Sequence, residues 1–578
     1  MGEQPAVDRG SLTHIARLGE TMTLTWQEAC ARVGASGSPF EIVEDDQDNR
    51  RFKHAPPNLR SLFDIARQGG DEIFIVFEDE RWSFSSVFER VDALADALVS
   101  RYGIRKGDRV AIGMRNYPEW VMSMLAIISI GGVSVSLNAL WVEDEIDYAL
   151  ADSGASLLIA DVERVARAIE PSRRLGIRLL EVRADQPSAD DVDQWNEVVV
   201  PGPAMPAVDV GWDDDATILY TSGTTGRPKG AVSTNGAIVS SVMAFGSRAA
   251  VDVVRAAAAA PEEATSEAGN PLSFILIVPL FHVTGCVPVL LSCVVSKSKL
   301  VMMYRWNAEK ALELIERERV TNFIGVPTQS WDLVNSPRFA DFDTSSLRGV
   351  GGGGAPAPPA LVERVAGTVK SGGPTLGYGM TETNAYGPNN TGDDYLTHPT
   401  STGRVMPIMR IEIRDPDGRQ VPTGERGEIW FNGPMLIRGY WNKPEATAET
   451  IVDGWLRSGD IGRVDEEGYF YIEDRLKDMI LRGGENVYCA EVEAAIYEHP
   501  AIHEAAVFGI PEERLGEEVA VAIHLVDGAT LNAEELRTFL STKIAAFMIP
   551  SKVVILSDPL PRNPAGKFLK RELRDQVS

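Results

Sequence analysis

Residues 221–230, TSGTTGRPKG, combine three glycines, four hydroxyl side chains and two cations, and they include no large apolar residue. Hydroxyl groups and backbone N–H groups left open by glycine are the donors that a polyphosphate needs, and Lys229 adds a positive charge. The segment is not a Walker A motif, because Pro228 stands five residues after Gly223, where that motif has its second glycine. The flanking runs ATILY and GAV predict a turn between two strands. A phosphate-binding turn is therefore expected, with a flexible surface turn as the alternative on residue types alone.

Other charged residues stand in short turn-like segments where they could serve the same chemistry. Lys567 lies in residues 561–573, PRNPAGKFLKREL, on a stretch stiffened by proline, although a solvated basic tail has the same composition. Glu382 stands in YGMTET, which on residue types alone could equally be a plain strand-to-loop segment. Asp460 and Arg475 fit either a ligand site or a surface ion pair. Residue types alone leave these roles open.

The overall charge excludes some classes of partner. The chain has 578 residues, 44% of them apolar and 24% charged, with 56 cations and 83 anions and hence a net charge of −27. This balance argues against a nucleic-acid binder and against docking to anionic membranes by bulk charge. An anionic ligand must therefore be attracted by local groups.

Cysteine usage and apolar patterning favour a cytoplasmic location. Four cysteines in this length make no disulfide framework, and the N-terminus shows no signal peptide pattern. Residues 121–142 carry no charge, but their glycines, serines and asparagine favour a buried helix followed by a buried strand over an integral membrane span.

The elements that must position these residues alternate between helical and strand-like segments. We expect an α/β fold: a large N-terminal domain with two helix-flanked β-sheets and a β-rich subdomain, plus a small mobile α+β C-terminal domain. The predicted boundaries are a partly irregular extension over residues 1–58, the large domain over 59–476 and the small domain over 477–578. Residues 256–270 are expected to form a surface loop.

Five ordered motifs together resemble those of the adenylate-forming enzymes, and specifically their acyl-CoA synthetase branch. They are TSGTTGRPKG, YGMTET (residues 378–383), GWLRSGDIG (454–462), DRLKDMILRGGENVYCAEVE (474–493) and PRNPAGKFLKREL. The resemblance covers residue 59 to the end. It implies two steps, in which a carboxylate attacks the α-phosphorus of ATP and the thiol of coenzyme A then displaces AMP.

The resemblance also implies roles for individual residues. The catalytic set is Lys567, Glu382, Thr381 and His282, with Glu382 holding Mg²⁺ and Lys229 binding the β- and γ-phosphates. The expected ATP and AMP contacts are Thr221, Ser222, Gly223, Thr224, Thr225, Gly226, Lys229, Gly353, Gly354, Ala355, Tyr378, Gly379, Thr381, Asp460, Arg475 and Lys567. The glycines and Ala355 would let the backbone approach the base, and Tyr378 would lie against adenine, with a structural glycine turn as the alternative.

For the second step, the resemblance implies a rotation of the small domain about Lys477. Gly483, Gly484 and Glu485 would then line the path of coenzyme A. Cys489 is expected to be buried or incidental, because coenzyme A supplies the thiol.

The acyl pocket is expected at His282, Val283, Gly285, Gly325 and Gly351. Residues 279–286, PLFHVTGC, offer no carboxylate for an amino-acid ammonium, which disfavours amino acids. The expected substrate is a medium- or long-chain fatty acid or an aryl-alkanoic acid. The alternatives are an enzyme that passes the acyl group to a non-CoA acceptor and a non-catalytic binding protein. A homodimer that uses the N-terminal extension is an open possibility beside a monomer.

Overall fold

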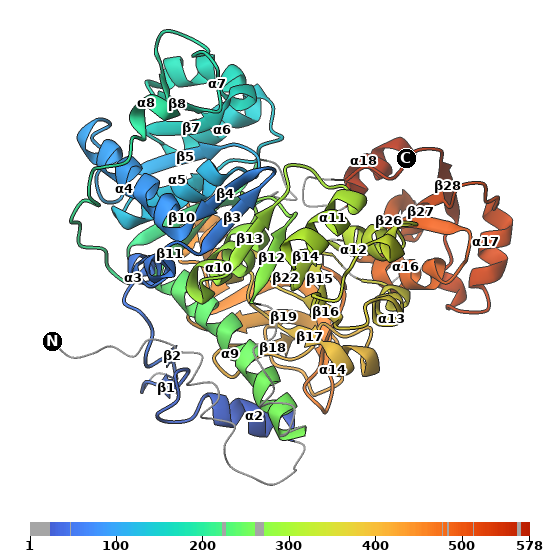
Figure 1. Cartoon of the computed structure of the whole chain (residues 1–578). Coiled ribbons are helices and arrows are strands. Elements are labelled where there is room, and N and C mark those ends of the chain that lie inside the picture. Colours follow the sequence, from blue (N-terminus) through green and yellow to red (C-terminus); the bar gives the residue numbers. More distant parts are fainter. Residues whose placement is uncertain are drawn as a thin grey trace.

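The computed structural model describes residues 24–577 except residue 47, residues 222–226 and 260–270, residues 356, 477, 483–484 and 513, and residues 563–567. Three large sheets and a two-stranded hairpin build the large N-terminal part, and a further sheet builds a small C-terminal part, drawn red in Figure 1. The predicted α/β fold with a small α+β C-terminal domain is thereby confirmed.

The first sheet is mostly parallel and carries the predicted phosphate loop. Its strands β6 and β7 are buried along their whole length, as expected for a parallel sheet covered on both faces. In order across the sheet the strands are β20 (Gly439–Tyr440), β11 (Lys229–Thr234), β10 (Asp215–Thr221), β6 (Val133–Ser136), β5 (Arg109–Gly113), β7 (Leu157–Asp161), β8 (Arg178–Val182) and β9 (Val192–Gln194).

The second sheet is parallel at its centre, with an antiparallel strand at each edge. In order across the sheet its strands are β17 (Asn389–Thr391), β16 (Gly373–Gly377), β15 (Gly349–Gly353), β14 (Asn322–Gly325), β12 (Ser273–Leu276), β13 (Lys299–Met302), β3 (Ile73–Phe77) and β4 (Glu80–Ser83).

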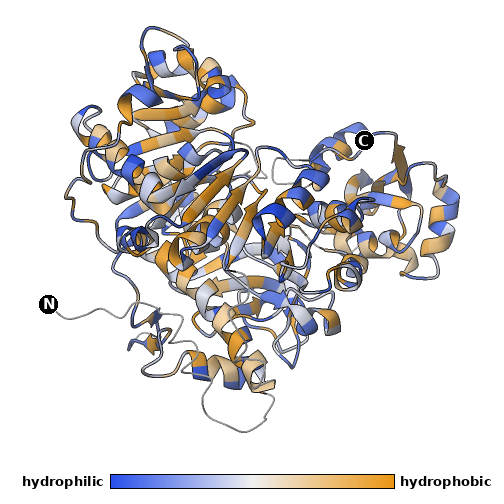
Figure 2. Ribbon diagram, in the orientation of Figure 1, coloured by the Kyte–Doolittle hydropathy of each residue, from blue (hydrophilic) through white to orange (hydrophobic). Residues whose placement is uncertain are grey.

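Helices cover these two sheets and fill the space between them. In chain order they are α3 (Leu59–Ala66), α4 (Phe84–Ser100), α5 (Pro118–Ser129), α6 (Glu143–Ser153), α7 (Val162–Leu175), α8 (Trp195–Val198), α9 (Asn235–Ala259), the π-helical turn η3 (Gly285–Leu291), α10 (Ser292–Ser296), α11 (Ala308–Glu318), α12 (Pro327–Val334), α13 (Pro359–Thr368) and α14 (Gly392–Thr397). Figure 2 shows hydrophobic residues concentrated on the inner strands and hydrophilic residues on the outer helices.

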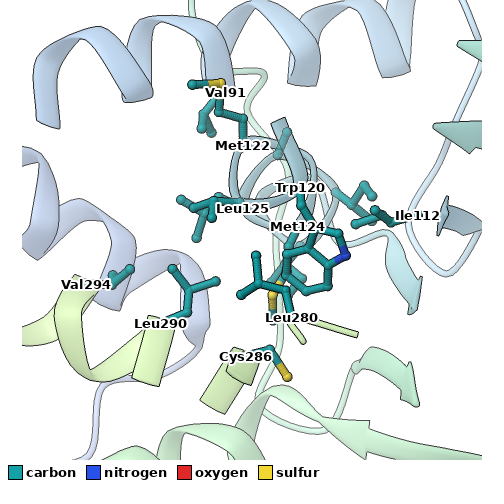
Figure 3. Packing of buried hydrophobic residues seen from close by; sticks show 14 of the residues in the cluster. Val91, Ile112, Trp120, Met122, Met124, Leu125, Leu280, Cys286, Leu290 and Val294 are labelled. Atoms are coloured by element: carbon teal, nitrogen blue, oxygen red, sulfur yellow. The ribbon is translucent and has the colours of Figure 1, made fainter. Parts of the chain in front are cut away.

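The largest core lies where α5 meets α4 and the η3–α10 segment. Every residue of α5 is buried, and so is every residue of β6, which confirms the reading of residues 121–142 as a buried helix and strand. Figure 3 shows Leu125 of α5 between Val91 of α4 and Leu290 of η3, with the Trp120 ring of α5 beside Leu280. A fully buried tryptophan contributes a large apolar area, so this contact fixes the two sheets together.

The β-rich subdomain and the small C-terminal part follow in sequence. The subdomain holds β18 (Arg410–Arg414), β19 (Gly427–Asn432), β22 (Trp455–Val464), β21 (Ile451–Val452) and β23 (Phe470–Arg475), with α15 (Pro444–Thr450) beside it. The small part holds β24 (Ile480–Arg482), β25 (Glu485–Val487), β26 (Ile502–Glu512), β27 (Gly516–Leu525), β28 (Lys552–Leu556), α16 (Cys489–Tyr497), α17 (Ala533–Leu540) and α18 (Lys570–Val577). Asn532 caps α17, because its side chain accepts from the backbone N–H groups of Glu534 and Glu535.

The N-terminal extension has more structure than its polar sequence indicates. Residues 24–58 contain α2 (Trp26–Val33), which has a Thr25–Glu28 capping box, and a hairpin of β1 (Ile42–Glu44) and β2 (Arg50–Phe52). The apolar side of α2 lies against α9 (Figure 1). Its buried residues Trp26, Ala29, Cys30 and Val33 recur at helical spacing, so the sequence carried a helix signal that the irregular interpretation missed.

The long helix α9 corrects a second expectation. It continues to Ala259, so residues 256–259 are helical and not loop, while residues 260–270 lie outside the described residues. Alanine is the best helix former, and the run of alanines here extends the helix. By length and composition α9 could cross a membrane, but 67% of its most apolar window is buried inside the protein.

Candidate nucleotide and acyl site

The two ends of the predicted phosphate loop are held firmly. β10 and β11 are antiparallel, with Thr221 opposite Lys229, which confirms the prediction of a strand-to-strand turn. The hydroxyl of Tyr148 donates to the carbonyl of Pro228 at 3.1 Å, and the backbone N–H of Trp441 donates to the carbonyl of Gly230 at 2.8 Å. The remaining loop residues, Ser222, Gly223, Thr224, Thr225 and Gly226, lie outside the described residues.

Glu382 is buried and engaged by a tyrosine that the sequence reading missed. It lies in the short turn η5 (Thr381–Thr383), beyond β16, and only 6% of it is exposed. The hydroxyl of Tyr440 donates to Oε1 of Glu382 at 2.7 Å, and Nζ of Lys229 lies 5.1 Å from the centroid of the Tyr440 ring. Burial and the Glu382 charge raise the pKa of the Tyr440 phenol, so this hydroxyl stays protonated. The structure thus brings Lys229 to the ring and Glu382 to the hydroxyl of one tyrosine.

The backbone around Thr381 and Glu382 is strained and anchored. Asn384 and Ala385 both have left-handed backbone angles, with φ of +50° and +65°. The Asn384 side chain donates to the carbonyl of Met435 at 2.9 Å, and the Ser241 hydroxyl of α9 donates to the Asn384 carbonyl at 2.8 Å. Such conformations persist only where their surroundings hold them, as is common at functional sites.

The proposed ribose contacts form a cluster of their own. Asp460 and Arg475 are opposite each other on β22 and β23, and the Arg475 Nε lies 3.4 Å from Asp460 Oδ1. The hydroxyl of Tyr378 donates to Asp460 Oδ2 at 2.5 Å, and burial together with the Asp460 charge raises the pKa of this phenol. Asp460 is only 8% exposed, unlike a carboxylate in an ordinary surface ion pair. Contact of Tyr378 with adenine and of Asp460 with ribose stays a prediction.

The glycines of β15 are required by neighbouring strands. A Cβ at Gly351 would lie 1.8 Å from the carbonyl oxygen of Thr375, and one at Gly353 would lie 2.3 Å from that of Gly377. Gly354, at φ +85°, faces open space apart from Val326 Cγ1 at 3.9 Å. Close strand packing therefore explains Gly351 and Gly353 without a ligand, whereas Gly354 offers room for one. Ala355 follows it, and Gly379 lies against the Ala385 backbone.

The residues predicted to line the acyl pocket are divided between the core and a more open region. Val283 is part of the main core, and a Cβ at Gly285 would lie 2.3 Å from the carbonyl oxygen of Pro279. His282 is half-buried, and its Nδ1 accepts from the Thr284 N–H at 3.3 Å. Gly325 faces Ile277 and Gln329. Gly351 borders a small apolar cavity under α12, α13 and α14. The other four predicted pocket residues do not line this cavity.

The junction between the large and small parts contains a buried carboxylate. Asp474, at the end of β23, accepts a hydrogen bond from the backbone N–H of Cys489 at the start of α16. Burial raises the pKa of Asp474 to about 6 and that of the Cys489 thiol well above its ordinary value, which agrees with an inert cysteine. Glu485 begins β25. Lys477, Gly483, Gly484 and Lys567 lie outside the described residues.

Comparison with known proteins decides the family. The model of the AMP-binding enzyme family matches residues 62–441, and that of the AMP-binding enzyme C-terminal domain matches residues 491–567. The chain belongs to the AMP-binding enzyme family. A feruloyl-CoA synthase of an Amycolatopsis species is 36% identical over 493 residues, which are 85% of this chain and 93% of the relative. The long-chain-fatty-acid–CoA ligase FadD13 of Mycobacterium tuberculosis is 34% identical over 507 residues, 86% of this chain and 94% of the relative.

A solved structure agrees with this assignment. The o-succinylbenzoate CoA synthetase MenE of Bacillus subtilis, in complex with its acyl-adenylate intermediate, has a TM-score of 0.76 at 28% identity. The match covers 90% of this chain and 98% of that one. The protein is thus an acyl-CoA synthetase, an AMP-forming acid–CoA ligase that uses ATP, Mg²⁺ and coenzyme A.

The donor set of this AMP-binding enzyme fits a magnesium ion that arrives with the nucleotide. No group of three or more His, Cys, Asp or Glu that could hold a metal occurs among the described residues. Mg²⁺ is commonly held by one or two carboxylates together with substrate phosphates. A single buried carboxylate, Glu382, is what such an arrangement needs.

Proposed function

We propose that this acyl-CoA synthetase activates an apolar carboxylic acid, either a medium- or long-chain fatty acid or an aryl-alkanoic acid. The observation that carries the proposal is the absence of a carboxylate, other than Glu382, in three described segments next to the predicted pocket. These segments are residues 235–251, 273–303 and 376–386.

Contacts between elements support the grouping of these segments. Ser241 of α9 bonds to Asn384 beyond β16, and Gly325 of β14 faces Ile277 beyond β12. The carboxylate of Glu382 is engaged by Tyr440. An amino-acid substrate would bury its ammonium group here without a partner, at a cost of several kcal/mol.

In the proposed division of labour, the residues of the large domain bind and orient ATP. Thr381, Lys229 and the loop over residues 221–226 would hold the phosphates, and Asp460 with Arg475 would hold the ribose. Glu382 would hold Mg²⁺, whose charge offsets that of the phosphates when it is bound. Lys567 would lie against the reacting carboxylate and α-phosphate in the first step, where a cation offsets the charge of two approaching anions.

For the second step we propose that the small domain turns about Lys477 and presents Gly483, Gly484 and Glu485 to coenzyme A. His282 would then border the acyl group between the two steps. Hinges of this kind absorb a large rotation in a few backbone angles.

The test is a panel of acids with ATP, Mg²⁺ and coenzyme A, followed by pyrophosphate release and by acyl-CoA formation. Straight-chain acids of increasing length, aryl-alkanoic acids and amino acids of matching size form the panel. We expect kcat/KM to rise about 3- to 4-fold for each methylene group until the pocket is full. The kcat/KM for amino acids should be about 100-fold lower than for apolar acids of the same size. An amino acid as the best substrate would refute the proposal.

A further inference from the structure

Tyr440 links the two sheets at the nucleotide site. Its strand β20 lies at the edge of the first sheet beside β11, with Tyr440 opposite Ala231. Its partner Glu382 follows β16 of the second sheet. The tyrosine is 9% exposed, so its hydroxyl is enclosed by protein. Tyr440 therefore joins the strand after the phosphate loop to the turn of the predicted magnesium carboxylate.

The segment before and including Tyr440 fixes Glu382 in two ways. The Ile437 N–H donates to the backbone carbonyl of Glu382 at 3.0 Å, and the Tyr440 hydroxyl donates to its carboxylate at 2.7 Å. The Tyr440 backbone is fixed in turn, because its N–H donates to the Thr447 hydroxyl at 2.9 Å. Backbone and side chain of Glu382 are therefore both oriented by one anchored segment.

The ring of Tyr440 makes a second contact, with Lys229. Lys229 begins β11, and its ammonium group lies 5.1 Å from the ring centroid, within the range of a cation–π contact. The ring of Tyr440 thus contacts the Lys229 ammonium, while its hydroxyl donates to the Glu382 carboxylate. The two charges are held apart and oriented without a direct salt bridge between them in the described contacts.

We infer that Tyr440 is a positioning residue that orients the Glu382 carboxylate for the magnesium ion of Mg·ATP. The inference rests on the proposed role of Glu382. The hydrogen bond from Tyr440 fixes the orientation of the Glu382 carboxylate, and such partners of metal ligands contribute about 10- to 100-fold to metal affinity. Tyr440 does not touch the reacting atoms and acts through Glu382.

The experiment measures ATP binding by calorimetry at a series of Mg²⁺ concentrations, with no acid present. Tyr440→Phe keeps the ring, and with it the contact to Lys229, but loses the hydroxyl. We expect the Mg²⁺ concentration for half-maximal enhancement of ATP affinity to rise about 10-fold. ATP affinity without Mg²⁺ should change less than about 2-fold, and saturating Mg²⁺ should restore binding.

Tyr102→Phe is the matched control. It removes a tyrosine hydroxyl that donates to Asp193 at 2.9 Å in the first sheet, away from the site. Its magnesium dependence should equal that of the wild type. Glu382→Gln should abolish most of the enhancement, and adding Tyr440→Phe to it should change nothing more, because the tyrosine acts through that carboxylate.

The outcomes separate this inference from the proposed function. Unchanged magnesium dependence in Tyr440→Phe, additive losses in the double variant, or a loss that saturating Mg²⁺ does not rescue would each overturn the inference. A wild type that binds Mg·ATP but releases pyrophosphate best with an amino acid would overturn the proposed substrate class alone. A wild type whose ATP binding is independent of Mg²⁺ would overturn both the inference and the role of Glu382.

Discussion

At the scale of single residues, the two lysines of the predicted site differ in what holds them. Lys229 begins a strand of the large domain and lies over the Tyr440 ring, so its position is fixed before any ligand arrives. Lys567 belongs by sequence to the small domain, in the motif over residues 561–573. A fixed cation suits binding of phosphates, whereas a cation on a second domain can act in one step and withdraw in the next.

The first prediction separates these roles. Lys567→Ala should lower the rate of adenylation at least about 100-fold, yet change thioester formation from supplied acyl-adenylate less than about 3-fold. Lys229→Ala should mainly raise the KM for ATP. Both half-reactions are followed separately by pyrophosphate release and by acyl-CoA formation. Lys552→Ala, at an exposed position on β28, is the control. Equal loss of both half-reactions in Lys567→Ala would contradict the prediction.

A second prediction concerns the Asp460 cluster. Asp460→Asn removes the charge that Tyr378 and Arg475 both contact, so AMP affinity should fall about 10- to 100-fold, the range for a hydrogen bond to a charged group. Tyr378→Phe removes one neutral hydrogen-bond donor and should lower AMP affinity about 3- to 10-fold. Calorimetric titration with AMP measures both. If Tyr378→Phe lowered AMP affinity more than Asp460→Asn, Asp460 would not be the residue that holds the nucleotide.

At the scale of elements, the N-terminal helix α2 is bound to the large domain by stacked arginines. The Arg404 guanidinium lies 4.7 Å from the Trp26 ring centroid and 4.3 Å from that of Tyr469, and it bonds to Asp394 at 2.6 Å. Arg255 of α9 bonds to the same carboxylate at 2.7 Å. Residues before the catalytic domain thus become part of its packing through planar cations.

The third prediction tests whether these contacts of Arg404 stabilise the packing of α2 on the large domain. Arg404→Ala should lower the free energy of unfolding by about 2–4 kcal/mol, because it removes two ring contacts and leaves a half-paired carboxylate inside the protein. Arg404→Lys should recover little of the loss, since an ammonium cannot stack as a planar guanidinium does. Denaturant unfolding followed by tryptophan fluorescence gives the measurement. The control is Arg419→Ala, which removes an exposed ion pair with Asp417 and should lower the free energy of unfolding by at most about 0.5 kcal/mol. A similarly small loss for Arg404→Ala would contradict the prediction.

At the scale of the whole molecule, the contact between the large and small parts is polar and partly buried. Arg426 of the β18–β19 connection pairs with Glu473, lies 4.7 Å from the Tyr488 ring centroid and reaches Glu491 at 3.8 Å. Asp474 accepts from the N-terminal N–H of α16. An interface of this kind permits relative motion more readily than a large hydrophobic one.

The fourth prediction uses the titration of Asp474. Burial raises its pKa from the ordinary value of 3.8 to about 6. The stabilising contribution of the protonated carboxyl is therefore fully present below pH 3.8 and is lost as the pH rises through about 6. Asp474→Asn, which resembles the protonated form, should match the wild type near pH 4 and be more stable by about 1–3 kcal/mol at pH 8. Thermal unfolding of both from pH 4 to 8 measures this. Parallel pH curves for the two proteins would contradict it.

Much of the fold and part of the site follow from local patterns. Residues 121–142 could be assigned to a buried helix and strand because their small polar residues and length suit a core better than a membrane. Asn532 could be identified as a helix cap because capping depends on the adjacent residues alone. The helical end of α9 was not predicted because an alanine-rich run gives little apolar period. The helix α2 does show the period, at Trp26, Ala29, Cys30 and Val33, but it spans only 8 residues.

The sequence by itself determined the family, the alternation of strands and helices and the identity of the charged groups for ATP, because motifs and periodicity are local properties of the chain. Only the tertiary structure decided which of these groups meet. Tyr440 reaches Glu382 from 58 residues away in sequence, and Tyr378 reaches Asp460 from 82 residues away. Such contacts depend on strand order and on the packing of one sheet against another, and no spacing along the chain encodes them.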